Sequence, residues 1–295
     1  MIKRTILVAS PSRLSLKNGQ LVCSSLTDEK EAKTAPVEDL GAVIVENQRA
    51  VLSVPLLNAL ASNNVSVIFC DGKTMPDSML VSLSANSTQG EMLRAQMSAG
   101  AVLNKHLWKQ VIESKIRNQA ALLDKIGRDG SALRPFYSNV KSGDSDNREG
   151  IAAKVYWNQL FGSGFSRDRD GDMPNGMLNY GYSILRSAVT RALLGSGISP
   201  ALGMFHRNRY NPMPLSDDMM EPFRPYVDEI VYELYNNGET ELTSEVKGYL
   251  INVLSCDTCF GDTRRPLQLG LSTATASLGR CFLGESKVLN LPIFQ

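Results

Sequence analysis

The sequence RLSLKNGQLVC (residues 13–23) places an Asn-Gly pair between two short segments in which apolar and polar residues alternate. Both residues of the pair tolerate a positive φ angle, which a two-residue type I′ turn requires at its two central positions. The stretch therefore predicts a β-hairpin. The surrounding pattern predicts further strands at 5–8, 42–45 and 65–70, and a short helix at 55–60 that begins with a proline.

After residue 90 the apolar residues follow the helical period. They recur every three or four positions from 91 to 123 without a proline, and Gly127 and Gly130 then end the run. The same period recurs at 151–161, 177–194, 222–235 and 244–254.

A β region followed by a larger helical region is an α+β arrangement, not an alternating α/β one. We therefore predict a small N-terminal β domain at 1–75, a linker at 76–90 and a nearly all-α C-terminal domain at 91–295.

Charge is unevenly distributed along the 295 residues, although the net charge is only +1. Between Arg134 and Arg209 there are ten basic and six acidic residues, whereas between Tyr210 and Glu245 there are one and nine. The small net charge argues against a uniformly basic nucleic-acid binder. The segregation instead predicts a basic face beside an acidic centre.

The cysteines and the apolar runs indicate the compartment. An odd number of cysteines, five, spread along the chain, and a first apolar run that is too short for a secretory signal are typical of a reducing environment. No segment approaches the roughly 18 apolar residues that cross a bilayer. We therefore expect a cytoplasmic protein that does not contact a membrane.

Residues that indicate chemistry gather in the C-terminal half. His206 is one of two histidines in the chain, and it is followed by Asp217, Asp218 and Glu221, with Glu149 upstream. Imidazole and carboxylate form a metal-ligand set, and arginines beside them suit an anionic substrate such as a phosphodiester. The sequence thus predicts metal-dependent chemistry on nucleic acid.

Each of these signals also has a structural explanation. Asp146 and Glu149 have the spacing of a helix capping box, and so do Asp218 and Glu221. Carboxylates at the start of a helix also stabilise its positive dipole end, and a single histidine is more often a core or surface residue. The explanations are compatible, because a carboxylate in a first helical turn can also face a metal.

The sequence resembles a known family over essentially its full length. GMFHRNRYNP (203–212) and LSDDMMEPFRP (215–225) resemble the metal-site region of the CRISPR-associated protein one family, the DNA integrase and endonuclease of spacer acquisition. PVEDLG (36–41), KIRNQA (115–120) and LNYGY (178–182) occur in the family's order. The resemblance is greatest to the type II branch, which works beside an RNA-guided effector nuclease.

The resemblance implies a β domain that forms a homodimer and a helical domain that holds the active site. It implies that Glu149, His206 and Glu221 are the catalytic metal ligands, with Asp218 behind them or as an alternative ligand. The expected ion is Mg²⁺ or Mn²⁺. Expected partners are double-stranded DNA (spacer precursor and CRISPR repeat), a small ferredoxin-like protein in a hetero-hexamer, and the effector nuclease.

The reaction that the resemblance implies is direct transesterification. A 3′-hydroxyl of the spacer precursor attacks the phosphodiester at the repeat boundary, which makes the chain a metal-dependent endonuclease and integrase of the hydrolase class. Two alternatives stay open. One is a free-standing metal-dependent nuclease that uses water on branched DNA, and the other is a non-catalytic DNA-binding assembly scaffold.

The first candidates for DNA contacts are Arg207 and Arg209, with solvent-exposed charges as the alternative. Tyr180 is a further candidate and Tyr182 lies nearby, with buried aromatic residues as the commoner outcome for both. A set of basic residues in the predicted helix either lines a duplex or forms the solvated face, and we favour the solvated face: Lys105, Lys109, Lys115 and Arg117.

Overall fold

The computed structural model describes residues 3–29, 31–82, 86–168 and 170–295. The chain divides into two compact units, residues 1–85 and 86–295, which are described separately. The predicted linker at 76–90 differs from this division. Its first residues form strand β8 (Pro76–Leu80), its last two begin helix α2, and residues 83–85 lie outside the described ranges.

Two four-stranded sheets form the first unit. In one, β1 (Arg4–Val8), β5 (Leu40–Val45) and β7 (Ser66–Cys70) are parallel, and β8 pairs antiparallel to β7 at the edge. The other has the order β4 (Lys33–Pro36), β3 (Gln20–Ser25), β2 (Ser12–Lys17) and β6 (Val51–Leu52). Helix α1 (Val54–Ser62) contacts strands of both sheets, and a 3₁₀ turn, η1 (Val37–Asp39), precedes β5.

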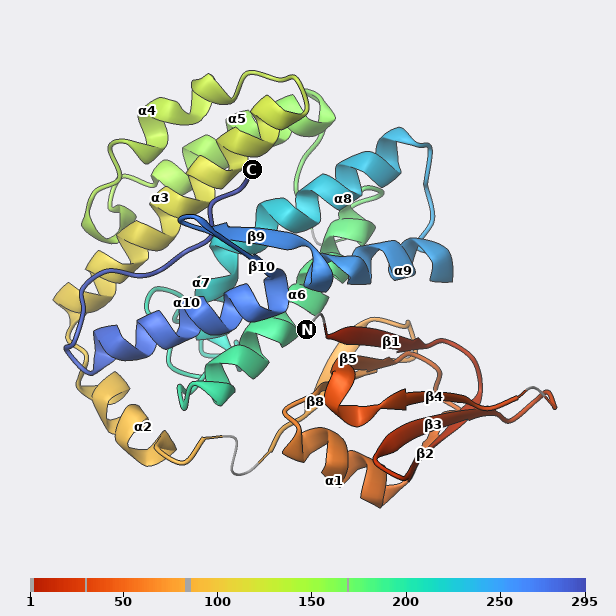
Figure 1. Ribbon diagram of the computed structural model, residues 1–295. Helices are drawn as coiled ribbons and strands as arrows, with labels where there is room; N and C mark the ends of the chain where they lie inside the picture. Colours follow the sequence, from red (N-terminus) through yellow and green to blue (C-terminus); the bar gives the residue numbers. More distant parts are fainter. Residues whose placement is uncertain (1–2, 30, 83–85, 169) are drawn as a thin grey trace. The chain divides into compact units, whose positions relative to one another are not determined.

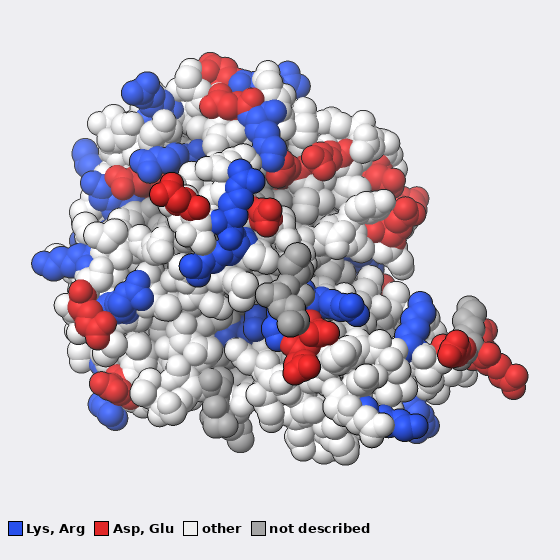
Figure 2. All heavy atoms as spheres, viewed as in Figure 1, with Lys and Arg blue, Asp and Glu red and all other residues white. Residues whose placement is uncertain are grey.

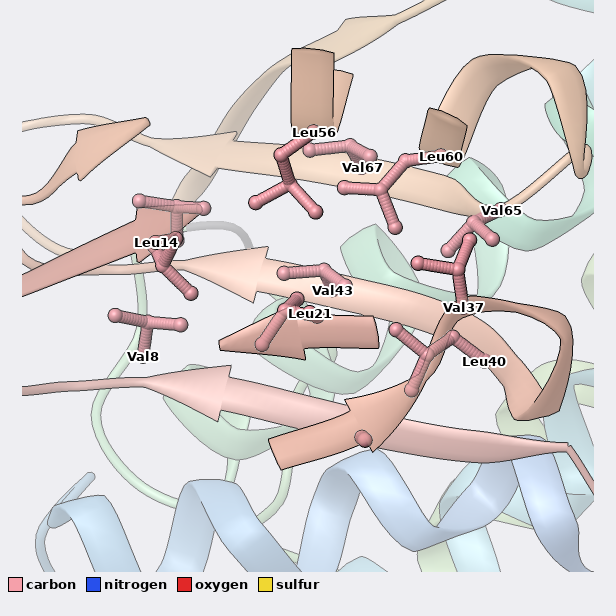
Figure 3. Close-up of a cluster of buried hydrophobic side chains, with 12 residues drawn as sticks. Val8, Leu14, Leu21, Val37, Leu40, Val43, Leu56, Leu60, Val65 and Val67 are labelled. Atoms are coloured by element: carbon pink, nitrogen blue, oxygen red, sulfur yellow. The ribbon is translucent and has the colours of Figure 1, made fainter. Parts of the chain in front are cut away.

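The predicted hairpin is confirmed. Strands β2 and β3 pair antiparallel around Asn18 and Gly19, whose φ angles are 51° and 72°, as a type I′ turn requires. Leucine and valine side chains from both sheets and α1 meet in the core, among them Leu14, Leu21 and Leu56 (Figure 3). All six residues of β5 are buried, which is typical of a central strand covered on both faces.

The second unit is mainly helical and is built around two long helices, α3 (Ala101–Lys125) and α6 (Asn175–Gly195) (Figure 1). Helix α3 contacts α4, α5, α7 and α8, and α6 contacts α7 to α10. The other helices are α2 (Gln89–Ser98), α4 (Arg134–Tyr137), α5 (Arg148–Phe161), α7 (Pro214–Met220), α8 (Arg224–Asn236), α9 (Ser244–Ile251) and α10 (Leu267–Phe282). The 3₁₀ helices are η2 (Gly130–Leu133), η3 (Ser142–Asp144), η4 (Glu221–Phe223) and η5 (Asn252–Ser255), and β9 (Asp257–Phe260) pairs with β10 (Thr263–Pro266).

Two features of this unit differ from the sequence predictions. The helix expected at 91–123 is two helices, because Ala99 (ψ 113°) and Gly100 (ψ 162°) have extended backbones between the end of α2 and the start of α3. Helix α10 and the β9–β10 hairpin were not predicted. Of the helices in the described ranges, none combines the length and the apolar character that crossing a bilayer requires.

A buried amide joins the middle of α3 to the segment that follows α7. The side chain of Asn118, in α3, donates to the carbonyl oxygens of Pro222 (2.8 Å) and Pro292 (3.1 Å) and accepts from the Phe294 N–H (3.1 Å). Because buried polar groups are costly unless they are paired, this amide fixes where η4 lies against α3. It thereby positions Glu221, the residue immediately before Pro222.

Candidate active site

Two of the predicted ligands meet at one lysine. Glu149 lies in the first turn of α5, Glu221 begins η4, and Lys115 lies in the middle of α3. The Lys115 Nζ atom is 2.5 Å from Glu149 Oε1 and 2.5 Å from Glu221 Oε2. Arg224 Nε is 2.9 Å from the other oxygen of Glu221. Residues that are 34 and 106 positions from Lys115 in sequence therefore form one charged cluster (the carboxylate–lysine cluster: Lys115, Glu149, Glu221 and Arg224).

The start of α5 is capped differently from the prediction. Asn147 is the N-cap and accepts from the Gly150 N–H, while Asp144 accepts from the backbone N–H groups of Arg148 (2.8 Å) and Glu149 (3.1 Å). Asp146 instead binds the Arg148 side chain at 2.8 Å. The predicted Asp146–Glu149 capping box is therefore wrong, because Asp144 and Asn147 satisfy these N–H groups and leave the Glu149 side chain to Lys115.

The second predicted capping box is also wrong. Helix α7 begins at Pro214, so Asp218 lies inside it and is fully buried. Its carboxylate accepts from the backbone N–H groups of Met204 (2.6 Å), Phe205 (3.1 Å) and His206 (3.2 Å). Asp218 therefore holds the loop that carries His206, rather than the start of a helix.

His206 is oriented by Asp218 and by an aromatic side chain. Its Nδ1 atom is 2.6 Å from Asp218 Oδ1, so we assign the proton to Nδ1, which leaves Nε2 with a lone pair. The ring meets Trp108 edge-on with centroids 5.7 Å apart, and Phe205 stacks on Trp108 at 4.4 Å. The hydrogen bond to Asp218 raises the pKa of His206, and the charge of Glu221 acts in the same direction.

Electrostatics keeps Lys115 and Glu221 charged although both are buried. Burial by itself would lower the pKa of Lys115, but the carboxylates of Glu221 and Glu149 outweigh it and the pKa is raised. Burial would likewise raise the pKa of Glu221, whose side chain is only 4% exposed, but Arg224 and Lys115 hold it below its usual value. Both partners are therefore stabilised in their ionised forms.

A second buried hydrogen-bond network contacts Arg224 through the ring of Tyr182. Tyr156 donates to Asp228 Oδ2 at 2.8 Å, Tyr182 donates to Asp228 Oδ1, and the guanidinium of Arg224 lies 4.4 Å from the centre of the Tyr182 ring. Burial raises the pKa of Asp228 to about 6, against the opposing effect of the two hydroxyl donors. The network fixes Arg224, which in turn holds Glu221.

The expected DNA contacts divide into exposed and buried residues. Arg207 and Arg209 are exposed and line a cavity of ≈ 570 Å³ together with His206. Tyr180 is fully buried, with Lys247 Nζ 5.6 Å from its ring centre, which is the buried aromatic given above as the commoner outcome. On the face drawn in Figure 2, basic and acidic side chains alternate, so no single basic face is visible there.

The roles of Lys115, Arg224 and Asp228 were not predicted from the sequence. We assigned Lys115 to the solvated face of a helix, but it is 7% exposed, whereas Lys105 and Arg117 are exposed. The signal was present in the helical period. Lys115 lies four positions after Val111, a core residue, and buried polar side chains continue the same face: Asn118 and Gln119.

The donors around the carboxylate–lysine cluster fit a divalent ion in type. Two carboxylates and an imidazole nitrogen suit Mg²⁺ or Mn²⁺, and one of the carboxylate oxygens, Glu221 Oε2, is already held against a cation, the Lys115 ammonium group. The distances between the candidate ligand side chains differ from those of a preformed metal site. In the described ranges, no three His, Cys, Asp or Glu side chains lie close enough together to hold a metal, and an ammonium group joins the two glutamates instead.

Comparisons with known proteins identify the family. A family model described as CRISPR associated protein Cas1 matches residues 6–252. The CRISPR-associated endonuclease Cas1 of Neisseria meningitidis serogroup C (strain 8013) is 39% identical over 258 residues, which cover 86% of this chain and 84% of that protein.

Two solved structures have the same fold. One is a casposase bound to an integration product, with a TM-score of 0.80 and 21% identity over 97% of this chain and 92% of the other. The second is a Cas6-RT-Cas1–Cas2 complex, with a TM-score of 0.72 and 18% identity over 100% of this chain and 36% of the other. From the family model and the 39% identical relative together, we conclude that the chain belongs to the CRISPR-associated Cas1 family.

Proposed function

We propose that this chain is a metal-dependent DNA integrase and endonuclease of CRISPR adaptation. The observation that carries the proposal is the meeting of Glu149 and Glu221, from different elements, at one buried cation. Carboxylates that converge on one point are the oxygen ligands by which proteins hold the divalent ions of phosphodiester chemistry. Membership of a family whose curated relative is named an endonuclease supports the same reaction class.

Glu149, Glu221 and the Nε2 atom of His206 would hold Mg²⁺ or Mn²⁺. Asp218 would stay outside the ligand set, because its oxygens already accept from three backbone N–H groups and from His206 Nδ1. A carboxylate behind a metal-binding histidine fixes its tautomer and its orientation. A bound ion would stabilise the additional negative charge of a phosphorane-like transition state.

The proposed reaction is a direct exchange of phosphodiester bonds. The 3′-oxygen of the spacer precursor attacks the phosphorus at the edge of the repeat. The bond that breaks joins this phosphorus to the 3′-oxygen of the preceding nucleotide in the attacked strand. The attacking hydroxyl loses its proton to solvent and the leaving oxygen takes one up. The number of phosphodiester bonds is unchanged, so no nucleotide energy source is needed.

Residues around the cluster have separate parts in this reaction. Arg207 and Arg209, exposed beside His206, would bind DNA phosphates. Arg224 would keep Glu221 in position through its 2.9 Å contact. No protein nucleophile is required, since the DNA supplies the attacking oxygen.

The assembly is proposed by analogy with the relatives. We expect a homodimer formed through the β unit, and two dimers bridged by a small ferredoxin-like partner of the Cas2 type. The effector nuclease of a type II system would assist in choosing the DNA that is captured. The support is that one structure with this fold is a complex containing Cas2 and another is bound to an integration product.

A strand-transfer assay tests the function. A labelled duplex with free 3′-hydroxyl ends is incubated with a supercoiled plasmid that carries the repeat, with Mn²⁺ or with chelator, and with the small partner protein. We expect covalent joining that requires Mn²⁺ and is lost in His206→Ala. The matched control is His106→Ala, which changes the other histidine of the chain, an exposed residue of α3.

The other outcomes separate the alternatives. Cutting without joining would favour a nuclease that uses water. If the protein binds the DNA but neither cuts nor joins it when the partner protein is present, a non-catalytic DNA-binding scaffold would be favoured. Joining that survives in chelator would contradict metal dependence.

A further inference from the structure

Lys115 has an unusual position for a lysine. Its side chain is only 9% exposed, and its ammonium group lies between carboxylates that approach from α5 and from η4. Lysine is rarely buried unless it is paired, because removing its charge from water is costly. Here the burial is offset by two ion pairs at 2.5 Å, which also hold the two glutamates at one place.

The charges of the carboxylate–lysine cluster balance without a metal. Two glutamates face one lysine and one arginine, so the cluster is neutral as it stands. Adding a divalent ion to the same carboxylates would bring three positive groups to two negative ones. Like charges within a few ångströms strongly disfavour one another in a buried site.

We infer that the ammonium group of Lys115 competes with the divalent ion for Glu149 and Glu221. It holds these carboxylates together in the metal-free protein and leaves them when the ion binds. This inference rests on the proposed function, since it concerns the same two ligands. It assigns Lys115 a positioning role rather than one as a ligand.

The competition links metal binding to DNA binding. Once displaced, the ammonium group needs another anion, and the phosphate of a bound DNA strand is the anion that this site is proposed to receive. DNA should therefore tighten metal binding, and metal should tighten DNA binding by the same factor. A variant that lacks the Lys115 ammonium group should lose this contribution to the coupling between metal binding and DNA binding.

Calorimetric titration of Mn²⁺ into the chelator-treated full-length protein tests the inference. The probes are Mn²⁺ alone and Mn²⁺ with a duplex whose strands end in 3′-deoxynucleotides, so that no chemistry occurs. In the absence of DNA, Lys115→Met should bind Mn²⁺ at least about tenfold more tightly than the wild type, because removing one nearby like charge changes such equilibria by one to three powers of ten. The duplex should tighten Mn²⁺ binding less in the variant than in the wild type.

Lys109→Met is the matched control. It removes a lysine from the same helix, where Lys109 pairs with Glu113 at 3.6 Å away from the cluster, and Mn²⁺ affinity should not change. Thermal unfolding gives a second readout. Metal-free Lys115→Met should melt below the wild type, and Mn²⁺ should raise its melting temperature more than it raises that of the wild type.

Equal or weaker Mn²⁺ binding by folded Lys115→Met would overturn the inference. If that variant does not fold, Lys115→Arg decides the matter. It keeps the charge and binds carboxylates in a fixed fork, so its Mn²⁺ affinity should be no higher than that of the wild type, and tighter binding would contradict the inference.

These results are distinguishable from failure of the proposed function. That failure would appear as wild-type protein with no Mn²⁺ site that depends on Glu149 and Glu221.

Discussion

Replacing Asp218 by asparagine should destabilise the loop that carries His206 and weaken metal binding, because it removes the negative charge to which the loop binds. The carboxylate accepts from Met204 and Phe205 through Oδ2, and from the backbone N–H and Nδ1 of His206 through Oδ1. An amide has only one oxygen. Placed at Oδ2, this oxygen still accepts from the backbone N–H groups of Met204 and Phe205, while the NH₂ group then faces the backbone N–H of His206 and its imidazole.

The cost can be estimated from these contacts. One backbone N–H loses its partner, which costs about 1–3 kcal/mol, and two further bonds lose their charge assistance, which costs about 1 kcal/mol each. We therefore expect Asp218→Asn to lower the free energy of unfolding by about 3–5 kcal/mol. The NH₂ group would also donate to Nδ1 and move the imidazole proton to Nε2, so Mn²⁺ affinity should fall by roughly 10- to 100-fold.

Urea unfolding and Mn²⁺ titration of the same preparations measure the two effects. Asp217→Asn is the control, since Asp217 is the neighbour of Asp218 but binds Asn211 (2.6 Å) and Arg186 (2.8 Å) instead of the His206 backbone and ring, so Mn²⁺ affinity should fall far less than in Asp218→Asn. Should Asp218→Asn keep wild-type stability and wild-type Mn²⁺ affinity, the argument that Asp218 orients His206 would be refuted.

Three further predictions concern residues around this site. The folded-state pKa of Asp228 is about 6, against 3.8 ordinarily, so its protonated form favours folding. That contribution is complete below about pH 4 and is lost as the pH rises through 6, so the unfolding free energy of the wild type should fall by about 2–3 kcal/mol relative to Asp228→Asn between about pH 4 and pH 7. Gly181→Ala should destabilise the protein by about 1–3 kcal/mol in urea, because a Cβ atom there would lie 2.5 Å from Val227 Cγ1. Arg207→Ala and Arg209→Ala should each weaken duplex binding and reduce the salt dependence of log K by about 1, measured by fluorescence anisotropy at several salt concentrations.

Each of these predictions has an outcome that would count against it. Parallel pH profiles for the wild type and Asp228→Asn would mean that this carboxylate titrates alike in the folded and unfolded states. Gly248→Ala is the control for Gly181, since nothing lies within 4 Å of its added Cβ atom in α9, and it should be neutral or stabilising. An unchanged salt slope in both arginine variants would mean that neither side chain contacts a phosphate.

Local sequence signals predicted much of the fold. The Asn18-Gly19 turn needs only two residues that accept positive φ, and β5 and β7 are short apolar runs, so these elements could be identified from their own sequence. Strand β8 was missed because it is an edge strand that begins with a proline and has polar, exposed residues at Asp77 and Ser78, so it lacks an apolar pattern. Its place is determined by pairing with β7.

The candidate site was predictable in its residue types but not in its contacts. Glu149, His206 and Glu221 follow from the chemistry of ligands and from the family resemblance. The structure joins Glu149 and Glu221 through Lys115, and whether the three bind a metal stays a prediction. The burial of Lys115 follows from the helical period of α3, but its partners could not be identified, because they come from α5 and η4 and no local pattern encodes contacts between distant elements.

The two capping boxes were predicted from local spacing but are not formed in the structure. Asp146 and Asp218 both have the right spacing, but Asp144 and Asn147 satisfy the start of α5, and Asp218 binds a loop that precedes its own helix. Several side chains can reach the N–H groups at the start of a helix, and which of them binds depends on the three-dimensional arrangement of the chain, which residue spacing does not encode.

Anomalous diffraction from crystals grown with Mn²⁺ and a 3′-deoxy duplex tests the central claim most directly. The account predicts a manganese peak bound by Glu149, Glu221 and the Nε2 atom of His206, with Asp218 still on Nδ1 and the Lys115 ammonium away from both glutamates. Manganese bound elsewhere, or absent while Lys115 still bridges Glu149 and Glu221 beside bound DNA, would contradict it.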